Sequence, residues 1–219
     1  MDEIINYYND LAGSYDENRF DNTYGKFIDL QERTILDKII NPEEHNVDLA
    51  CGTGRLSNYA QIGIDASAAM VEIAKKKFPE KIFLKNEADA LDLDNDSVDT
   101  ILSFHFFMHL NEIKTKKILA ECNRVLKKNG RIILDIPSSK RRKILGYKAN
   151  NWHGANSLSI ADFKQHPNFK VKRTFGVLFF PIHRFPNFCR RFFVKIDSVL
   201  ANSFLKEYSS YLIIELEKK

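Results

Sequence analysis

Hydrophobic and polar residues follow two different spacings along this chain. Short apolar runs predict strands, which we place near residues 47–50, 61–65, 82–85, 98–103 and 131–136. Apolar residues that recur every three or four positions predict helices, which we place near residues 2–12, 24–40, 68–78 and 112–128. Because strands and helices alternate, the pattern predicts an α/β fold with a mostly parallel sheet.

Residues that typically cap helices refine these boundaries. Gly130 should cap the helix that begins near residue 112. Ser159 and Asp162 form a capping-box-like pair, which predicts a further short helix. Residues 171–175 and 211–216 then have the composition of two final strands.

Size and composition fit one domain. The chain has 219 residues, of which 44% are hydrophobic, enough for a sizeable single core. No apolar stretch approaches the ~20 residues that a membrane-spanning helix needs. The first residues are acidic and lack the basic and apolar regions of a signal peptide. The three cysteines are odd in number and dispersed, so we expect a cytoplasmic protein without disulfides.

A glycine-rich turn follows the first predicted strand. Residues 47–54 read Val-Asp-Leu-Ala-Cys-Gly-Thr-Gly. Glycine has no Cβ, so backbone N–H groups in such a turn can approach a ligand closely. Asp65 ends the next strand, and its carboxylate can accept hydrogen bonds from both hydroxyls of a ribose. Together these features predict a nucleoside site at the carboxyl ends of the first two strands.

Two residues narrow the kind of nucleoside. A dinucleotide site usually carries Gly-x-Gly-x-x-Gly, but Ser57 stands at the third glycine position. Asp48 would place a negative charge beside a pyrophosphate, whereas it suits a cofactor with an ammonium and a sulfonium group. Both residues therefore disfavour a nucleotide-dependent oxidoreductase.

Residues 48–54 resemble the first motif of the class I S-adenosylmethionine (SAM)-dependent methyltransferases, with Ala50 at the first glycine of the motif. The resemblance continues through residues 65–70, 87–91, 96–101 and 124–131, and it extends in particular to the small-molecule branch that includes ubiquinone and menaquinone methyltransferases. It implies a Rossmann-like sheet of seven mostly parallel strands with an antiparallel last strand and helices on both faces. Asp65 follows Gly54 by only eleven residues, so we expect the first crossover helix to be shortened to about two turns.

The resemblance also implies how one methyltransferase domain over residues 1–219 is divided. Residues 1–41 would form a helical lid, and residues 42–139 would form the SAM-binding core. Residues 140–219 would form the substrate side and the final strand hairpin, with an insertion near 176–210.

Roles for single residues are implied by the same resemblance. Asp65 would bind the ribose, and Glu87 and Ala88 would flank the adenine. The residues expected around SAM are Asp48, Ala50, Gly52, Thr53, Gly54, Asp65, Ala66, Met70, Glu87, Ala88 and Ser103. In the lid, Tyr15 and Arg19 are candidates for contacts with the cofactor or the substrate, or else they are surface residues of a helical cap.

His105 and His109 follow the fourth strand at a spacing that would place them on one face of a helix. They are the candidates for a general base that takes a proton from the acceptor, and the alternative is ordinary packing or capping. We expect no metal, because no Glu lies between them and no third ligand is evident.

Positive charge is concentrated late in the chain. Residues 140–195 contain thirteen Lys and Arg but one acidic residue, Asp162. Seven phenylalanines lie between Phe175 and Phe193. This mixture suits an anionic amphiphile, a lipid surface or nucleic acid, and it also suits a sheet cover whose charges face solvent. Because the apolar residues cluster, we favour lipid over nucleic acid and expect acceptor or membrane binding to depend on Phe179, Phe180, Arg184 and Phe185.

The sequence therefore predicts a SAM-dependent methyltransferase that acts on a small, amphiphilic or anionic acceptor by in-line displacement. The alternatives are a SAM-binding module without turnover and an RNA or protein methyltransferase. The first motifs bind the cofactor without reacting, so they do not separate these possibilities.

Overall fold

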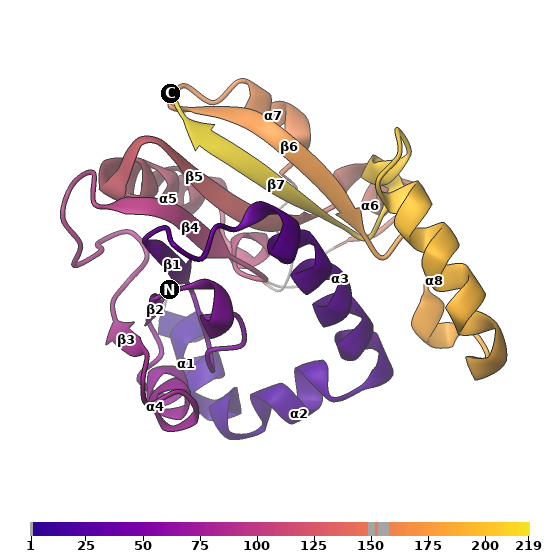
Figure 1. Cartoon of the computed structure of the whole chain (residues 1–219), viewed down its shortest axis with the longest axis horizontal. Helices are drawn as coiled ribbons and strands as arrows, with labels where there is room; N and C mark the ends of the chain where they lie inside the picture. Colours follow the sequence, from indigo (N-terminus) through magenta and orange to yellow (C-terminus); the bar gives the residue numbers. More distant parts are fainter. Residues whose placement is uncertain (1, 149–151, 153–157) are drawn as a thin grey trace.

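The structure is a computed structural model that describes residues 2–148, 152 and 158–219. Seven strands form one sheet in the order β3-β2-β1-β4-β5-β7-β6 (Figure 1). The strands are β1 (Asn46–Leu49), β2 (Ile62–Asp65), β3 (Ile82–Lys85), β4 (Val98–Ser103), β5 (Leu126–Pro137), β6 (Phe169–Val177) and β7 (Tyr211–Lys218). The first five strands are parallel, and β7 runs antiparallel to both β5 and β6. This arrangement confirms the expected Rossmann-like fold.

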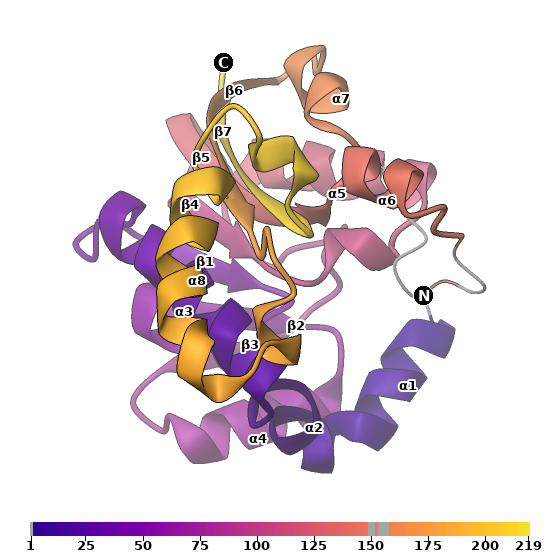
Figure 2. The same cartoon turned by 90° about the vertical axis from the view of Figure 1, so that its right-hand side faces the viewer.

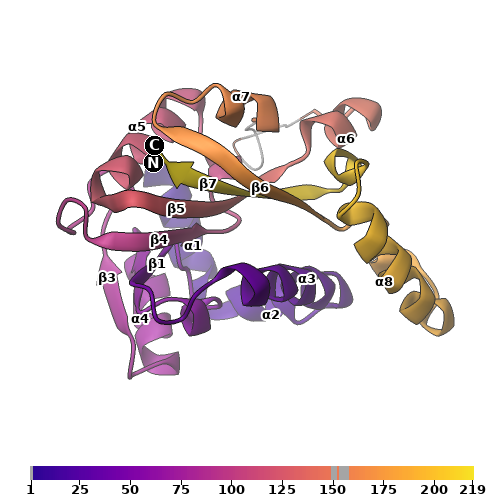
Figure 3. The ribbon, with the colours of Figure 1, turned by 45° about the horizontal axis from the view of Figure 1, so that its top comes forward.

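Helices cover both faces of the sheet (Figure 3). They are α1 (Asp2–Leu11), α2 (Tyr15–Phe20), α3 (Thr23–Ile39), α4 (Ala68–Lys77), α5 (Glu112–Val125), α6 (Ser139–Ile144), α7 (Ile160–Lys164) and α8 (Asn187–Ala201). Successive residues of a strand face opposite sides, so Ile132 and Leu134 pack with α5 and α7 while Ile133 packs with α3. In the described part of the chain, no helix combines the length and the apolar character needed to cross a membrane.

Side-chain caps explain where several helices begin. The Asn22 carboxamide accepts a hydrogen bond from the Gly25 N–H at 2.9 Å at the start of α3. Asn111 does the same for α5, with 2.9 Å to the Lys114 N–H. The pair of Ser159 and Asp162 forms the expected capping box at α7.

The prediction of a helix to residue 128, capped by Gly130, is wrong. The helix α5 ends at Val125, and Leu126 is already extended and pairs with Val98 of β4. Gly130 lies within β5, where an added Cβ would come within 2.8 Å of the Lys127 carbonyl oxygen. Strand pairing with β4 therefore overrides the helical spacing of these residues.

Two connections also differ from expectation. The link from β1 to β2 contains one 3₁₀ turn, Ser57–Tyr59, rather than a two-turn helix, because the glycine-rich turn and the entry to β2 take up the remaining residues. The insertion between β6 and β7 folds into α8, which the sequence pattern did not reveal.

The expected lid over residues 1–41 divides into two parts. The helix α3 packs Phe27, Ile28 and Leu36 into the core, so it belongs to the helical layer that covers one face of the sheet. The helices α1 and α2 instead run across one end of the molecule (Figure 2). We call residues 2–20 the strap.

Hydrogen bonds fasten the strap to the rest of the protein. The Ser67 hydroxyl donates to Asn9 Oδ1 at 2.6 Å, and the Thr53 hydroxyl donates to Asp16 Oδ1 at 2.6 Å. Asp16 also pairs with Lys77 at 2.7 Å. The strap is therefore held against the glycine-rich turn and the start of α4.

Candidate functional site

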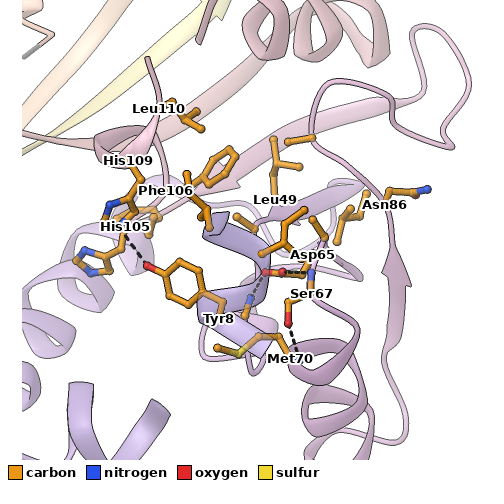
Figure 4. Close-up of a pocket in the computed structure, with 18 of the residues that line it drawn as sticks. Tyr8, Leu49, Asp65, Ser67, Met70, Asn86, His105, Phe106, His109 and Leu110 are labelled. Carbon is orange, nitrogen blue, oxygen red and sulfur yellow. Dashed lines mark hydrogen bonds between the residues drawn. The ribbon is translucent and has the colours of Figure 1, made fainter. Parts of the chain in front are cut away.

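A cavity of about 760 Å³, counted with its open mouth, lies at the carboxyl ends of β1, β2 and β4, beneath α1 (Figure 4). Strand order reverses between β1 and β4, which is where ligands bind in open α/β sheets. We call this the first cavity. The expected site residues that line it are Tyr15, Ala50, Gly52, Asp65, Ala66, Met70, Ala88, His105 and His109.

Asp65 organises the floor of the first cavity. One carboxylate oxygen accepts a hydrogen bond from the Gly52 N–H at 2.8 Å, and the other accepts one from the Ser67 N–H at 2.8 Å. Burial raises the pKa of this carboxyl, and the backbone hydrogen bonds oppose the rise. Asp65 thus ties the glycine-rich turn to the start of α4, and because a carboxylate has about four acceptor sites, it can still accept a hydrogen bond from a ligand.

The glycine-rich turn uses positive φ angles at Ala50 (60°), Gly52 (53°) and Gly54 (84°). Ala50 adopts this conformation at a cost of roughly 1–2 kcal/mol. A Cβ at Gly52 would meet nothing within 4 Å, so the turn leaves open space there. A Cβ at Gly54 would lie 3.0 Å from Phe78 and 3.2 Å from Phe83. The two glycines therefore serve different ends: Gly52 borders the cavity, and Gly54 permits close packing.

Asp48 and Thr53 line a smaller hollow beside the first cavity, and Ala50 and Gly52 belong to both walls. Asp48 is almost fully buried in β1. Burial raises its pKa to about 7; Arg55 opposes the rise, and Asp65 adds to it. Asp48 is therefore a carboxyl whose charge depends on what lies beside it.

Five residues expected near the cofactor lie outside the first cavity: Asp48 and Thr53 line the adjoining hollow, and Gly54, Glu87 and Ser103 line neither space. The Glu87 side chain is half exposed and 3.9 Å from Lys114, on the outer side of the loop after β3. Its neighbour Asn86 lines the cavity instead and has a buried Oδ1 with no partner among the described residues. Ser103 is fully buried at the end of β4, and Phe104 takes its place in the wall.

The prediction that His105 and His109 share a helix face is wrong. His105 precedes the 3₁₀ turn Phe107–His109 and has a positive φ of 56°. Its backbone N–H donates a hydrogen bond to Asp135 Oδ1 at 2.6 Å. Its Nε2 lies 3.0 Å from Glu32 Oε1, and its Nδ1 lies 3.4 Å from Asp135 Oδ2. Both ring nitrogens of His105 therefore face buried carboxylates, which leaves none directed at an acceptor.

The carboxylates around His105 belong to a buried charge network. Glu32 also lies 2.8 Å from Arg55, which pairs with Asp29 at 2.5 Å. Burial would raise the pKa of Glu32, but His105 and Arg55 outweigh it and lower that pKa to about 2. The ligand atoms of Glu32, His105 and Asp135 lie within 4.8 Å of one another. Glu32 lies beside Nε2 and Asp135 beside Nδ1, so the two carboxylates contact opposite nitrogens of one imidazole.

A second cavity of about 1,430 Å³, also counted with its open mouth, adjoins the first. Tyr8, Tyr15, His105 and His109 line both cavities. The Tyr8 hydroxyl and His109 Nε2 lie 3.2 Å apart at this shared wall (Figure 4). Arg19, the other expected lid residue, lines the second cavity.

Comparisons with known proteins agree on one family. A family model described as a methyltransferase domain matches residues 47–134. A ubiquinone/menaquinone biosynthesis C-methyltransferase of Campylobacter jejuni is 30% identical over 159 residues, which cover 65% of this chain and 66% of that protein. An uncharacterized protein of Methanocaldococcus jannaschii is 38% identical over 136 residues, which cover 61% of this chain and 51% of that protein. The matches thus span about half to two thirds of these relatives.

The fold is also found among solved structures. A SAM-dependent methyltransferase of Thermotoga maritima, a possible histamine N-methyltransferase, superposes with a TM-score of 0.71 and 22% sequence identity, over 97% of this chain and 98% of that one. The strand order, the glycine-rich turn with Asp65, and the matching family model lead to the same conclusion. These findings support a class I SAM-dependent methyltransferase.

Proposed function

We propose that this protein transfers a methyl group from SAM in the first cavity to a small-molecule acceptor in the second. The observation that carries the proposal is the shared wall of Tyr8, Tyr15, His105 and His109, which lets two ligands meet. Asp65 at the end of β2 would take the ribose hydroxyls. The methionine end would lie toward Gly52 and Asp48, so the sulfonium would face the wall.

The reaction needs alignment more than a covalent catalyst. A lone pair of the acceptor forms a bond to the methyl carbon, the carbon–sulfur bond breaks, and its electrons leave S-adenosylhomocysteine (SAH) with a neutral sulfur. Positive charge disperses in the transition state, so water exclusion and orientation supply much of the rate. The fastened strap would exclude water.

An acceptor proton, where there is one, would pass to His109. Its Nε2 lies beside the Tyr8 hydroxyl at the shared wall. His105 is better suited to holding the wall in position, because both of its nitrogens face carboxylates.

Turnover separates an enzyme from a binding module. The protein is incubated with methyl-labelled SAM and a fractionated extract of small metabolites, and both SAH and labelled products are followed by mass spectrometry. An enzyme produces SAH and a labelled small molecule in equal amounts. Tight SAM binding with no SAH formed in any fraction would support the non-catalytic module instead.

Substitutions of Gly52 and Gly54 are expected to differ in their main effect, the first on cofactor binding and the second on stability. In Gly52→Val, the side chain would fill the open space at the cavity and would strain a backbone whose φ is 53°, so the melting temperature should fall somewhat and SAH should no longer raise it. In Gly54→Val, the side chain would collide with Phe78 and Phe83, so the melting temperature itself should fall. Thermal scans with and without SAH distinguish the two. A full SAH-induced shift in Gly52→Val would contradict the placement of the cofactor.

Cofactor binding is expected to strengthen as pH rises through about 7, the pKa of Asp48. The methionine ammonium favours ionised Asp48, so binding at about pH 8 should be several-fold tighter than at about pH 6. In the absence of cofactor, the stability of the fold depends on pH in the opposite direction. Because folding raises the pKa of Asp48, its contribution to stability is fully present below its unfolded pKa of about 4. That contribution is lost as pH rises through about 7.

Calorimetric titration of SAH across this pH range tests the role of Asp48. The control is Asp48→Asn, which should remove the pH dependence of affinity. An equal slope in both proteins would assign the titration to another group.

We further propose that α8 docks on an anionic lipid surface. The residues Phe188, Phe192 and Val199 are 89%, 65% and 69% exposed and share one side of the helix with exposed Lys195. The opposite side is anchored, because buried Asp197 accepts hydrogen bonds from the Phe180 N–H at 2.6 Å and the Gln31 side chain at 2.7 Å. Exposed rings with cations suit insertion at a membrane surface.

This placement corrects the sequence-based choice of residues. Phe180 and Phe185 pack on each other and on Phe193, with ring centroids 4.7–6.4 Å apart, and Phe180 packs against the core. Phe179 is only partly exposed and contacts Phe180 edge to face. These rings therefore pack beneath α8, whereas Phe188 and Phe192 of α8 are exposed and available to contact a lipid surface.

Co-sedimentation tests the lipid proposal. Vesicles of phosphatidylglycerol and phosphatidylcholine should bind the protein, less so at high salt, and the double variant F188D/F192D should lose binding by about tenfold or more. The control is Ile113→Asp on α5, an equally exposed apolar residue far from α8. No binding to anionic vesicles, or equal loss in the control, would reject the proposal.

A further inference from the structure

The second cavity has an unusual charge. Four arginines line it, Arg19, Arg141, Arg142 and Arg184, and within the described ranges no aspartate or glutamate does. Five arginines elsewhere in the described chain pair with carboxylates, and Arg190 donates to backbone carbonyl oxygens instead. The five are Arg33, Arg55, Arg124, Arg131 and Arg173. The positive charge of this cavity is therefore not balanced by acids in its own wall.

Arg19 is the most telling of the four. It projects from α2 and is half buried, yet its guanidinium has no carboxylate partner in the described part of the chain. The groups that surround it are the phenols of Tyr8, Tyr15, Tyr24 and Tyr211. A partly desolvated cation without an anion is costly, and a bound anion would relieve that cost.

The tyrosines around Arg19 are fitted to donate hydrogen bonds. Burial raises the pKa of both Tyr8 and Tyr24, so their hydroxyls keep their protons at neutral pH. Tyr24 is hydrogen-bonded to Tyr211. Neutral phenols beside a guanidinium bring no competing negative charge, and a hydroxyl that is not used in the Tyr24–Tyr211 or Tyr8–His109 contact can donate to a carboxylate or a phosphate.

The other arginines extend this donor set toward the mouth of the cavity. Arg141 donates to the Phe179 and Tyr208 carbonyl oxygens at 2.7 and 2.8 Å, so it is fixed in place; its nearest compensating charge is the buried carboxyl of Asp197, which does not line the cavity. Arg184 is exposed at the edge of the cavity. A positive field at an entrance attracts anions from solution.

We propose that the second cavity binds an acceptor through a phosphate or carboxylate group, with Arg19 as the central contact. The inference rests on the proposed methyl transfer and narrows its acceptor to an anionic molecule. The anion at Arg19 would lie within the same cavity as the shared wall of Tyr8 and His109, so the rest of a small acceptor could reach the methyl group. The planar guanidinium favours two-pronged contacts with such anions.

Binding of simple probes to the SAH-saturated protein tests this proposal. Phenyl phosphate and benzoate should bind in calorimetric titration, whereas benzyl alcohol and benzylammonium should not. The variant Arg19→Met should weaken binding of phenyl phosphate at least about tenfold and leave SAH affinity unchanged. Exposed Arg184→Met, which poses little risk to the fold, should weaken it less, and the control Lys164→Met on α7 should have no effect.

A further arm separates a free anion from a lipid headgroup. Dihexanoyl phosphatidate that binds more tightly than phenyl phosphate, and loses affinity in Arg19→Met, would identify an anionic amphiphile; the reverse order would identify a free phosphate ester. Equal binding of charged and neutral probes, or an unchanged affinity in Arg19→Met, would overturn the anion site while SAH binding still supported the methyltransferase. Failure of SAH itself to bind would instead overturn the proposed function.

Discussion

Replacing Asp65 with alanine is expected to weaken SAM binding at least about tenfold, because each charge-assisted hydrogen bond to the ribose is worth ~1.5–3 kcal/mol. The structure adds a second reason. Asp65 also accepts the Gly52 and Ser67 N–H groups at 2.8 Å, so its loss would release the glycine-rich turn from the start of α4. Calorimetric titration with SAM measures the effect.

The control for this variant is Asp94→Ala, which removes an exposed acid from the loop before β4. It should bind SAM like the unaltered protein. A folded Asp65→Ala variant with unchanged affinity would show that the ribose lies elsewhere, and a melting curve establishes that the variant is folded.

The largest loss of stability is expected from Arg55→Met. This change leaves Glu32, whose side chain is 1% exposed, without one of its two partners, so that only His105 remains beside it; breaking a buried pair costs ~3–5 kcal/mol of unfolding free energy. Arg55 also contacts Asp29 at 2.5 Å and stacks over Phe20 at 4.6 Å. Urea denaturation measures the free energy of unfolding.

An exposed ion pair gives the comparison. Lys116 and Glu112 are 72% and 75% exposed, and Lys116→Met should change the free energy of unfolding by only ~0–1 kcal/mol.

The stability that Glu32 contributes should also depend on pH. Because the folded pKa of Glu32 is lowered to about 2, its contribution to the free energy of unfolding is present above the unfolded pKa of about 4.3 and is lost as pH falls toward about 2. A loss as small as that of Lys116→Met would mean that solvent compensates Glu32.

The features that could be predicted from the sequence are those formed by residues that lie close together along the chain. The glycine-rich turn and Asp65 lie on adjacent strands of one short segment, so spacing alone brought them together, and the structure joins them by a hydrogen bond. The strand pattern likewise led to the correct sheet, since apolar runs and turn residues mark each parallel strand.

The residues that surround His105 could not be placed in this way. Glu32 lies on α3 and Asp135 on β5, and only the folded sheet brings them to the imidazole. A partial signal existed, because Asp135 is a charged residue inside the apolar run of a buried strand. Such a residue needs a buried partner, but the pattern does not say which one.

The second cavity was hidden for the same reason. Its arginines come from α2, from α6 and from the segment before α8, which are far apart in the chain. Regional charge showed that residues 140–195 are basic, yet it could not show that Arg19 of the strap faces the same space. The direction of the α8 side chains also depended on packing: Asp197 fixes which phenylalanines are covered.

The structure of a complex with SAH is the most direct test of the central claim that the two cavities hold cofactor and acceptor on either side of one wall. We expect ribose hydroxyls on Asp65, adenine between Ala66 and Ala88, and the sulfur directed at the wall of Tyr8 and His109, toward the second cavity. SAH bound elsewhere, or with its sulfur directed away from the second cavity, would contradict it.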